Sequence, residues 1–206
     1  MTERSTPRRP GRQRLPREER ARRVLDVAAR LFYERGVHEV GMDELIRETG
    51  LGKATVYRLF PSKDELIGAY LERRARVTLG FIDADIAAHT GRPAEAMAAI
   101  VDGVRTHIEG DGSRGCPFNN ASIEFDDPAH PARVQARAYR EGLRARLRGL
   151  AEELTGASEL GDHLAVLIDG MYTSAAHLGA AGPARSGHEL ARHLISRASG
   201  SSAVDD

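Results

Sequence analysis

The chain has 206 residues, with 30 basic and 30 acidic side chains, so its formal net charge is zero. No segment reaches the roughly 18 apolar residues that a membrane span needs, and no hydrophobic run follows the basic N-terminus as it would in a signal peptide. The single cysteine, Cys116, excludes an internal disulfide, which is typical of a protein in a reducing cytoplasm. We therefore expect a cytoplasmic protein with no membrane partner.

The neutral total conceals an uneven distribution of charge. Residues 1–76 contain 18 Lys and Arg against 12 Asp and Glu, a net charge of +6, and the remainder contains 12 against 18, a net charge of −6. The two lysines of the chain, Lys53 and Lys63, both fall in the basic part, although an arginine-biased composition alone could place them there by chance. A basic unit beside an acidic remainder is what a chain needs to dock one end on nucleic acid.

The N-terminal segment, residues 1–16, is rich in Arg and Pro and has no apolar run. We expect a disordered basic arm, which either lies along DNA phosphates or the minor groove or serves only as a solubilising tail. An amphipathic helix is predicted to follow from Arg20 to Arg35, and Gly36 is predicted to end it.

Residues 43–60 predict two short helices joined by a turn at Gly50. After the turn, Val56, Leu59 and Phe60 recur at helical spacing and predict a buried side. The opposite side of this second helix offers a cation, a small residue, a phenol and a guanidinium: Lys53, Ala54, Tyr57 and Arg58. Such a face suits the major groove of DNA, so the pattern predicts a helix-turn-helix.

The residues after this helix predict where the next one begins. Pro61 ends the recognition helix, and Ser62 with Glu65 three residues later has capping-box spacing. The free backbone N–H groups of a helix start attract phosphate, and Lys63 lies beside them.

Together these segments resemble the DNA-binding domain of TetR-family transcriptional regulators, over the run from Arg17 to Arg74. The matching pieces are Ala-Ala-Arg-Leu-Phe-Tyr-Glu-Arg-Gly (28–36), Thr-Gly-Leu-Gly-Lys-Ala-Thr-Val-Tyr-Arg-Leu-Phe (49–60) and Pro-Ser-Lys-Asp-Glu-Leu (61–66). Two positions depart from the family pattern. Gly41 replaces a phosphate-contacting Thr or Ser, and Gly52 replaces a Ser that often opens the recognition helix.

The resemblance implies roles for individual residues. Tyr57 and Lys63 are expected to grip phosphate, and four others are expected to approach base edges or the adjacent backbone: Lys53, Ala54, Thr55 and Arg58. It also implies a homodimeric repressor that leaves a near-palindromic operator when a small-molecule effector binds. No cofactor is expected.

Beyond residue 80 the pattern stays helical, with no alternating strand-like run. The expected fold is all-α, a small three-helix helix-turn-helix domain followed by a larger helical bundle for regulation and dimerisation. The expected divisions are the arm at 1–16, the DNA-binding domain at 17–64, the regulatory domain at 65–198 and a disordered tail at 199–206.

The last two predicted helices, Leu160 to His177 and Gly187 to Ala198, each carry an apolar stripe. One recognition helix reads only a few base pairs, so useful specificity favours a two-fold dimer. In the family this helix pair forms the dimer interface, and the alternative is that both stripes belong to the internal core. The stripes comprise Leu160, Leu164, Leu167, Ile168, Met171, Tyr172 and Ala175, and Leu190, Ala191, Leu194 and Ala198.

The family also has an effector pocket in the larger bundle. Candidate lining residues mix apolar bulk with a few polar groups, as small-molecule sites do, although each could instead belong to the core. They are Val104, His107, Ile108, Phe118, Asn119, Ile123, Tyr139, Leu167, Met171 and Tyr172.

Two alternative functions remain open at this stage. Cys116 follows a glycine-rich loop and could act as a thiol switch that releases DNA on oxidation or alkylation, with Arg114 lowering its pKa. An all-helical enzyme or scaffold is disfavoured, because no nucleophile turn is present and the charge is asymmetric. No metal site is expected, since the histidines are scattered and His188 and His193 are five residues apart.

Overall fold

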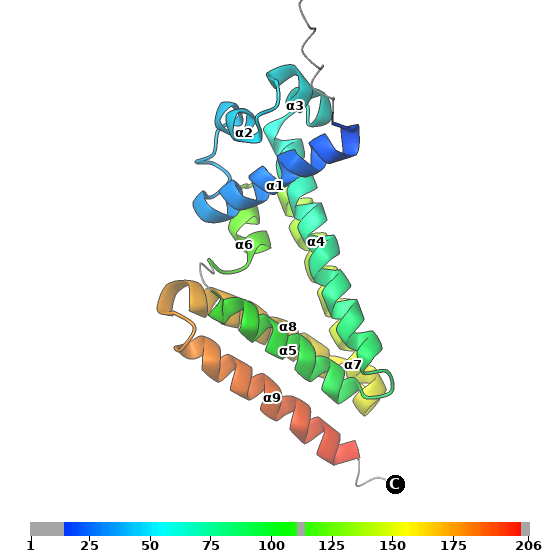
Figure 1. The fold of residues 1–206 in the computed structure, drawn as a ribbon. Helices are drawn as coiled ribbons and strands as arrows, with labels where there is room; N and C mark the ends of the chain where they lie inside the picture. Colours follow the sequence, from blue (N-terminus) through cyan, green and yellow to red (C-terminus); the bar gives the residue numbers. More distant parts are fainter. Residues whose placement is uncertain (1–14, 111–113, 203–206) are drawn as a thin grey trace, which may run out of the picture.

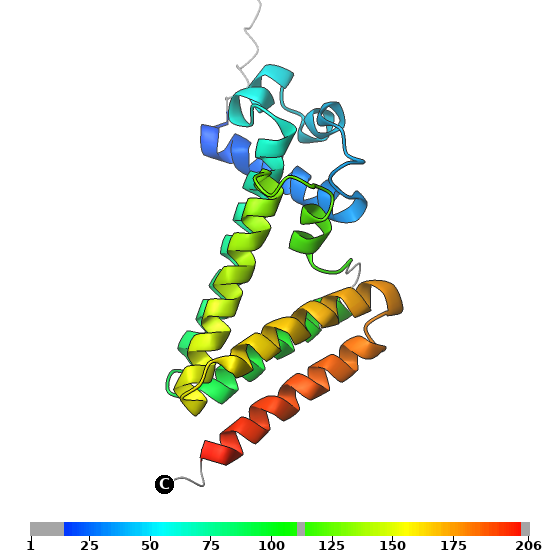
Figure 2. The same ribbon diagram turned by 180° about the vertical axis from the view of Figure 1, so that it is seen from behind.

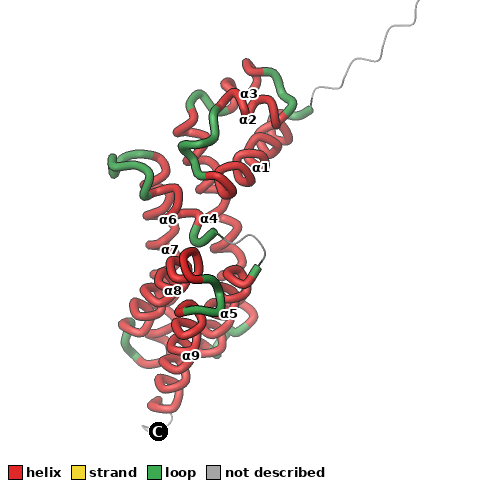
Figure 3. The backbone as a smooth tube through the Cα atoms, turned by 90° about the vertical axis from the view of Figure 1, so that its left-hand side faces the viewer, coloured by secondary structure: helices red, strands yellow, loops and turns green. Residues whose placement is uncertain are grey.

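A computed structural model describes residues 15–110 and 114–202, and within these ranges the chain forms nine helices and no strand (Figures 1 and 3). The expected all-α fold is thereby confirmed. The helices are α1 (Arg17–Arg35), α2 (Met42–Thr49), α3 (Lys53–Leu59), α4 (Lys63–Ala88), α5 (Pro93–Glu109), α6 (Pro117–Ser122), α7 (Pro131–Thr155), α8 (Glu159–Leu178) and α9 (Pro183–Ser202).

Helices α1 to α3 form a small head around the first turns of α4 (Figure 1). Its core is fully buried at Val24, Leu45 and Val56, one apolar side chain from each of the three helices. The ring of Tyr70 on α4 lies 5.8 Å from that of Phe32 on α1. Because α4 begins in the head and ends in the larger bundle, it connects the two parts as one continuous rod.

Helix α7 lies alongside α4, and α5, α8 and α9 cross the far end of this pair (Figures 1 and 2). Glycine allows two of the close approaches. A Cβ atom added at Gly68 on α4 would lie 2.8 Å from the Cβ of Pro131 at the start of α7, and one added at Gly161 on α8 would lie 2.5 Å from the backbone nitrogen of Arg148 on α7. The buried core runs without interruption from the head into this bundle.

Several predicted helix ends differ from those observed. Helix α1 starts three residues before Arg20, and α9 runs from Pro183 to Ser202 instead of from Gly187 to Ala198. Residues 199–202, expected in a disordered tail, therefore continue the last helix; their small polar side chains gave no apolar pattern to reveal this. The N-terminal arm at 1–14 and residues 203–206 lie outside the described residues.

The stripes on the last two helices mostly face inward. Leu164, Ile168 and Met171 are nearly or fully buried within the chain, as is Ala191 on α9. These four residues therefore belong to the internal core, which is the alternative that the sequence left open, because α8 and α9 pack on each other and on α5 and α7. The use of this helix pair as a dimer interface stays a prediction. Leu190 of the predicted stripe on α9 is exposed instead, and α8 exposes two apolar side chains from outside its stripe, Val166 and Leu178.

Candidate nucleic-acid interface and ligand pocket

A buried hydroxyl braces the turn between α2 and α3, beside the backbone hydrogen bond from the N–H of Gly50 to the carbonyl of Arg47. Thr49 Oγ1 donates to the carbonyl of Ile46 at 2.8 Å and accepts from the N–H of Leu51 at 3.1 Å. Gly50 between them has φ of +64°, which glycine adopts without the penalty that a Cβ would bring. This turn fixes the orientation of α3 against α2.

Helix α3 buries Val56 and leaves the opposite face in solvent, as the sequence predicts. Lys53, Ala54, Tyr57 and Arg58 are exposed, and Thr55 is half-buried. Each of the five is thus located on or beside the surface that would meet DNA. Their contacts with DNA remain a prediction.

Lys53 is engaged by groups of the chain itself. Its Nζ lies 3.0 Å from Oδ1 of Asp43 on α2 and 5.9 Å from the centre of the Tyr57 ring. The hydrogen bond that Lys53 donates to Asp43, followed by the charge of that carboxylate, raises the pKa of Lys53. A phosphate or base that binds Lys53 must therefore compete with Asp43.

Lys63 begins α4 at the edge of the head. Its Nζ donates to the backbone carbonyl of His38 at 3.3 Å, and it is half-buried. The preceding Ser62 caps the helix, since its Oγ accepts from the N–H of Glu65 at 3.1 Å, as its position in the sequence predicts. Lys63 thus projects beside a capped helix start.

The two glycine departures leave helix starts without side-chain caps. Gly41 precedes α2 and Gly52 precedes α3, and neither helix has a side-chain hydrogen bond at its N-cap. A Cβ atom at either glycine would meet nothing within 4 Å. The backbone around the missing hydroxyls is therefore open, and those phosphate contacts would have to come from other groups.

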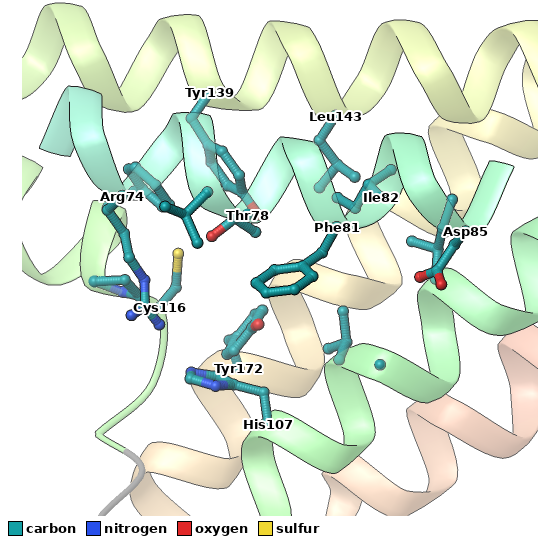
Figure 4. A pocket seen from close by; sticks show the side chains of 16 residues that line it. Arg74, Thr78, Phe81, Ile82, Asp85, His107, Cys116, Tyr139, Leu143 and Tyr172 are labelled. Atoms are coloured by element: carbon teal, nitrogen blue, oxygen red, sulfur yellow. The ribbon is translucent and has the colours of Figure 1, made fainter. Parts of the chain in front are cut away.

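A cavity of about 310 Å³ lies in the larger part of the molecule, among α4, α5, α7, α8 and the segment leading into α6 (Figure 4). Five of the ten predicted residues line it: Val104, His107, Phe118, Tyr139 and Tyr172. The rings of Phe118 and Tyr139 stack 3.8 Å apart and nearly parallel, which gives one wall a fixed shape.

The other candidates lie elsewhere. Met171 and Ile108 pack with Ala184 in a small separate core beneath α9, and Leu167 packs against the main core. Asn119 and Ile123 face a groove on the head side, where Ile123 is 78% exposed. None of these five lines the cavity, because on a helix a shift of one residue turns the side chain by about 100°.

Sequence reasoning missed the α4 side of the cavity. One continuous face of that helix supplies much of the lining: Arg74, Val77, Thr78, Phe81, Ile82 and Asp85. The spacing of these residues, mostly three or four apart, places them on one face of the helix. An exposed phenylalanine on that face, Phe81, would have indicated a binding surface. The pocket is thus bounded by the rod that carries the head.

The ionisable groups of the cavity are mostly held neutral. Burial raises the pKa of Tyr139 and Tyr172 well above the usual range of a phenol. Burial, and then the charge of Arg74, lowers the pKa of His107. Burial also raises the pKa of the Cys116 thiol, which keeps it in the less nucleophilic form and disfavours the thiol-switch alternative.

Two sets of hydrogen bonds join the head to the segment that carries Cys116 and Phe118. The hydroxyl of Tyr33 on α1 accepts from the N–H of Arg114 at 2.8 Å and donates to the carbonyl of Gly115 at 3.3 Å. After α6, the carboxylate of Glu124 accepts from the N–H groups of Val37 and His38 at 3.3 and 3.1 Å. A shift of this segment would therefore change its hydrogen bonds to Tyr33, Val37 and His38 in the head.

Neither a metal cluster nor a membrane helix emerges from the described part of the chain. Residues 15–110 and 114–202 contain no group of three or more His, Cys, Asp or Glu side chains placed to hold a metal ion. Over the same ranges, none of the helices combines the length and apolar character needed to cross a bilayer.

Comparison with known proteins gives matches along most of the chain. The sequence profile of the bacterial regulatory proteins of the tetR family matches residues 24–70, and that of the tetracyclin repressor-like C-terminal domain matches residues 93–193. The HTH-type transcriptional activator FasR of Mycolicibacterium smegmatis is 45% identical over 60 residues, which are 29% of this chain and 27% of that relative. The curated match thus spans under a third of the relative's length.

Solved structures are similar over a longer span. SCO4454, a TetR-family transcriptional regulator from Streptomyces coelicolor, is 29% identical with a TM-score of 0.81, covering 88% of this chain and 97% of that one. The reduced form of E. coli NemR has a TM-score of 0.77 at 19% identity, covering 85% and 96%. At 19% identity, the similarity to NemR shows only that the two chains share a fold.

Proposed function

This chain belongs to the TetR family of bacterial regulatory proteins, so it is a DNA-binding transcriptional regulator and not an enzyme. We propose that it is a homodimeric repressor. It binds a near-palindromic operator in the cytoplasm and leaves it when a small molecule fills the cavity beside α4. The observation that carries this proposal is the exposed face of α3, with Lys53, Tyr57 and Arg58 presented opposite the buried Val56. That face is shaped and charged for a major groove.

Dimerisation is supported by the apolar residues left outside on the last two helices. Val166 is 71% exposed, Leu178 67% and Leu190 47%. Large apolar side chains left in solvent on adjacent helices favour burial against a second surface. A symmetric partner would present the same two helices, so a single two-fold contact could cover these side chains in both copies.

Control by a ligand is supported by the position of the cavity. Arg74 and Phe81 belong to the helix that starts in the head, and Cys116 and Phe118 belong to the segment tied to the head through Tyr33 and Glu124. A ligand that binds more tightly to one orientation of these elements would shift the separation of the two heads of a dimer. Ligand and operator affinities would then be linked without direct contact.

The proposal is tested with the purified full chain and the DNA that flanks its gene. Fluorescence anisotropy at two salt concentrations, with random duplex as competitor, should give tight, competitor-resistant binding at two proteins per site. Transcription in vitro from the same DNA reports the sign of regulation, which matters because the relative FasR is an activator. Weak binding to every duplex, abolished by salt, would contradict an operator at this location.

We expect replacement of Asp43 by Asn to strengthen binding to all duplexes about two- to fivefold, because it frees Lys53 and removes a negative charge facing phosphate. The dependence of affinity on salt should become steeper by about one released counterion. Asp83→Asn is the matched control, since Asp83 pairs with Arg146 far from the head. Equal effects of the two variants on DNA affinity would contradict a DNA-facing role for Lys53.

We expect replacement of Gly103 by Leu to weaken effector binding at least about tenfold while leaving operator binding intact, because the new side chain would occupy the cavity. Gly103 lines that cavity, and a Cβ there meets nothing within 4 Å, so the fold has room for it. Operator release is titrated with the effector found by screening. Gly80→Leu is the control, since Gly80 is also an open helical site but does not line the cavity.

A further inference from the structure

One end of the cavity holds a half-buried arginine, Arg74, that has no counter-ion among the described residues. The Nε atom of Arg74 is buried and has no hydrogen-bond partner, and within the described part of the chain no carboxylate lies within ion-pair distance of its guanidinium. Most other half-buried arginines of the bundle are paired, as Arg146 is with Asp83 and Arg148 with Asp162. A guanidinium nitrogen that is buried without a hydrogen-bond partner is costly, so its presence points to a partner that arrives from outside.

A second buried nitrogen without a partner lies at the same end. The Nε2 atom of His107 is buried without a partner, and its ring meets that of Tyr172 edge-on at 5.8 Å. Because the pKa of His107 is lowered by burial and by Arg74, the imidazole is neutral and can donate one hydrogen bond. Figure 4 shows Arg74, His107 and Tyr172 bordering the same end of the cavity. This end therefore offers one positive charge and neutral hydrogen-bonding groups.

The middle of the cavity is apolar and open. Phe81 is 69% exposed and Val77 49% exposed although both line the cavity, and Phe81 projects into it (Figure 4). Leu143 and Ile82 form the wall behind them. A large aromatic side chain left this exposed gains most when an apolar group covers it.

The far end carries the opposite charge. Asp85 lines the cavity three helical turns beyond Arg74, roughly 16 Å along α4. A ligand with two negative ends would place its second charge near this carboxylate and be repelled. The single cation at one end and the single anion at the other thus favour a ligand with one negative charge.

Resting on the proposed function, in which this cavity holds the effector, we propose that the effector is a small monocarboxylate with an aromatic or branched aliphatic body. Its carboxylate pairs with Arg74 and accepts a hydrogen bond from His107. Its body lies against Phe81, Val77 and Leu143. The cavity volume of about 310 Å³ is at the small end of the range for ligand pockets, roughly 300–1,000 Å³, which limits the ligand's size.

The test compares ligands that differ only in charge. Benzoate, 3-phenylpropionate and 4-phenylbutyrate, each with its neutral amide and its cationic amine analogue, are titrated by calorimetry against the full-length protein without DNA. The same series is then added to the protein bound to its operator. The protein is studied unchanged and as Arg74→Met, with Arg76→Met as the matched control, because Arg76 is exposed on the same helix and pairs with Glu72.

At least one acid should bind the unchanged protein about 10- to 100-fold more tightly than its amide, which is the range expected for a desolvated charge-assisted contact. Arg74→Met should bring that ratio close to one, and Arg76→Met should leave it unchanged. His107→Phe should reduce the ratio by a smaller factor. Circular dichroism establishes that each variant is folded.

Three outcomes would overturn the inference: no acid of the series binds at millimolar concentration, an amide or amine binds as tightly as its acid, or Arg74→Met keeps the ratio. Because binding is measured without DNA, the ligand class and ligand control are judged separately. An acid held through Arg74 that leaves operator binding unchanged would support the ligand class and contradict ligand control. Failure to find an operator would leave the calorimetric result standing.

Discussion

Replacing Arg58 with alanine should relax discrimination between operator and random DNA by about 1–3 kcal/mol, the amount expected for loss of a bidentate guanine contact. Arg58 is exposed on α3, and among the described residues it forms no hydrogen bond or ion pair. Unlike Lys53, it has no internal partner to give up when it meets a base. Competition anisotropy with single-base operator variants would also identify the base pair at which discrimination is lost.

Lys63→Ala is the comparison for this experiment. Lys63 lies at the start of α4 and donates to the carbonyl of His38, and by resemblance to the family we expect it to contact phosphate and not base edges. Its loss should weaken binding to all sequences alike and flatten the salt dependence. If Arg58→Ala instead lowered specific and random binding equally, the base-reading role assigned to Arg58 would be wrong.

Replacing Gly161 with alanine should lower the free energy of unfolding by about 3 kcal/mol, the upper part of the usual range for overpacking. The added Cβ would lie 2.5 Å from the backbone nitrogen of Arg148 and 2.6 Å from its Cα. Backbone atoms cannot rotate away as a side chain can, so α7 and α8 would have to separate. Urea unfolding followed by circular dichroism measures the change.

The same substitution at Gly149 provides the control, with the opposite sign expected. Gly149 is exposed within α7, and a Cβ there would meet nothing within 4 Å. Alanine should therefore stabilise the protein by roughly 0.5–1 kcal/mol through helix propensity. A stabilised Gly161→Ala would mean that α7 and α8 can part without loss, contrary to the close packing described.

The helix-turn-helix could be predicted from the sequence because its signals are local. The turn at Gly50, the buried spacing of Val56 and Phe60 and the cap at Ser62 all act within a few residues of one another. Local geometry of this kind is set by backbone sterics and helical periodicity, and both can be inferred from residue types and their spacing. The exposed side of α3 then follows from its buried side.

The cavity could be predicted only in part, because its walls come from five segments distant in sequence. His107, Phe118, Tyr139 and Tyr172 were identified as amphipathic or aromatic residues in the right helices. Met171 has the same character but points into the contact with α9. Helical periodicity identifies which face of a helix is apolar. It does not identify the segment against which that face packs.

The sequence by itself thus determined the helical class, the DNA-reading unit and which of its side chains face outward. Only the tertiary structure decided that Lys53 pairs with Asp43, that the Nε atom of Arg74 is buried near His107 without a partner, and that Cys116 is buried. The physical reason is the range of the interactions. Helix periodicity and capping act over about four residues, whereas burial, desolvation and ion pairing depend on which distant segments the packing brings together.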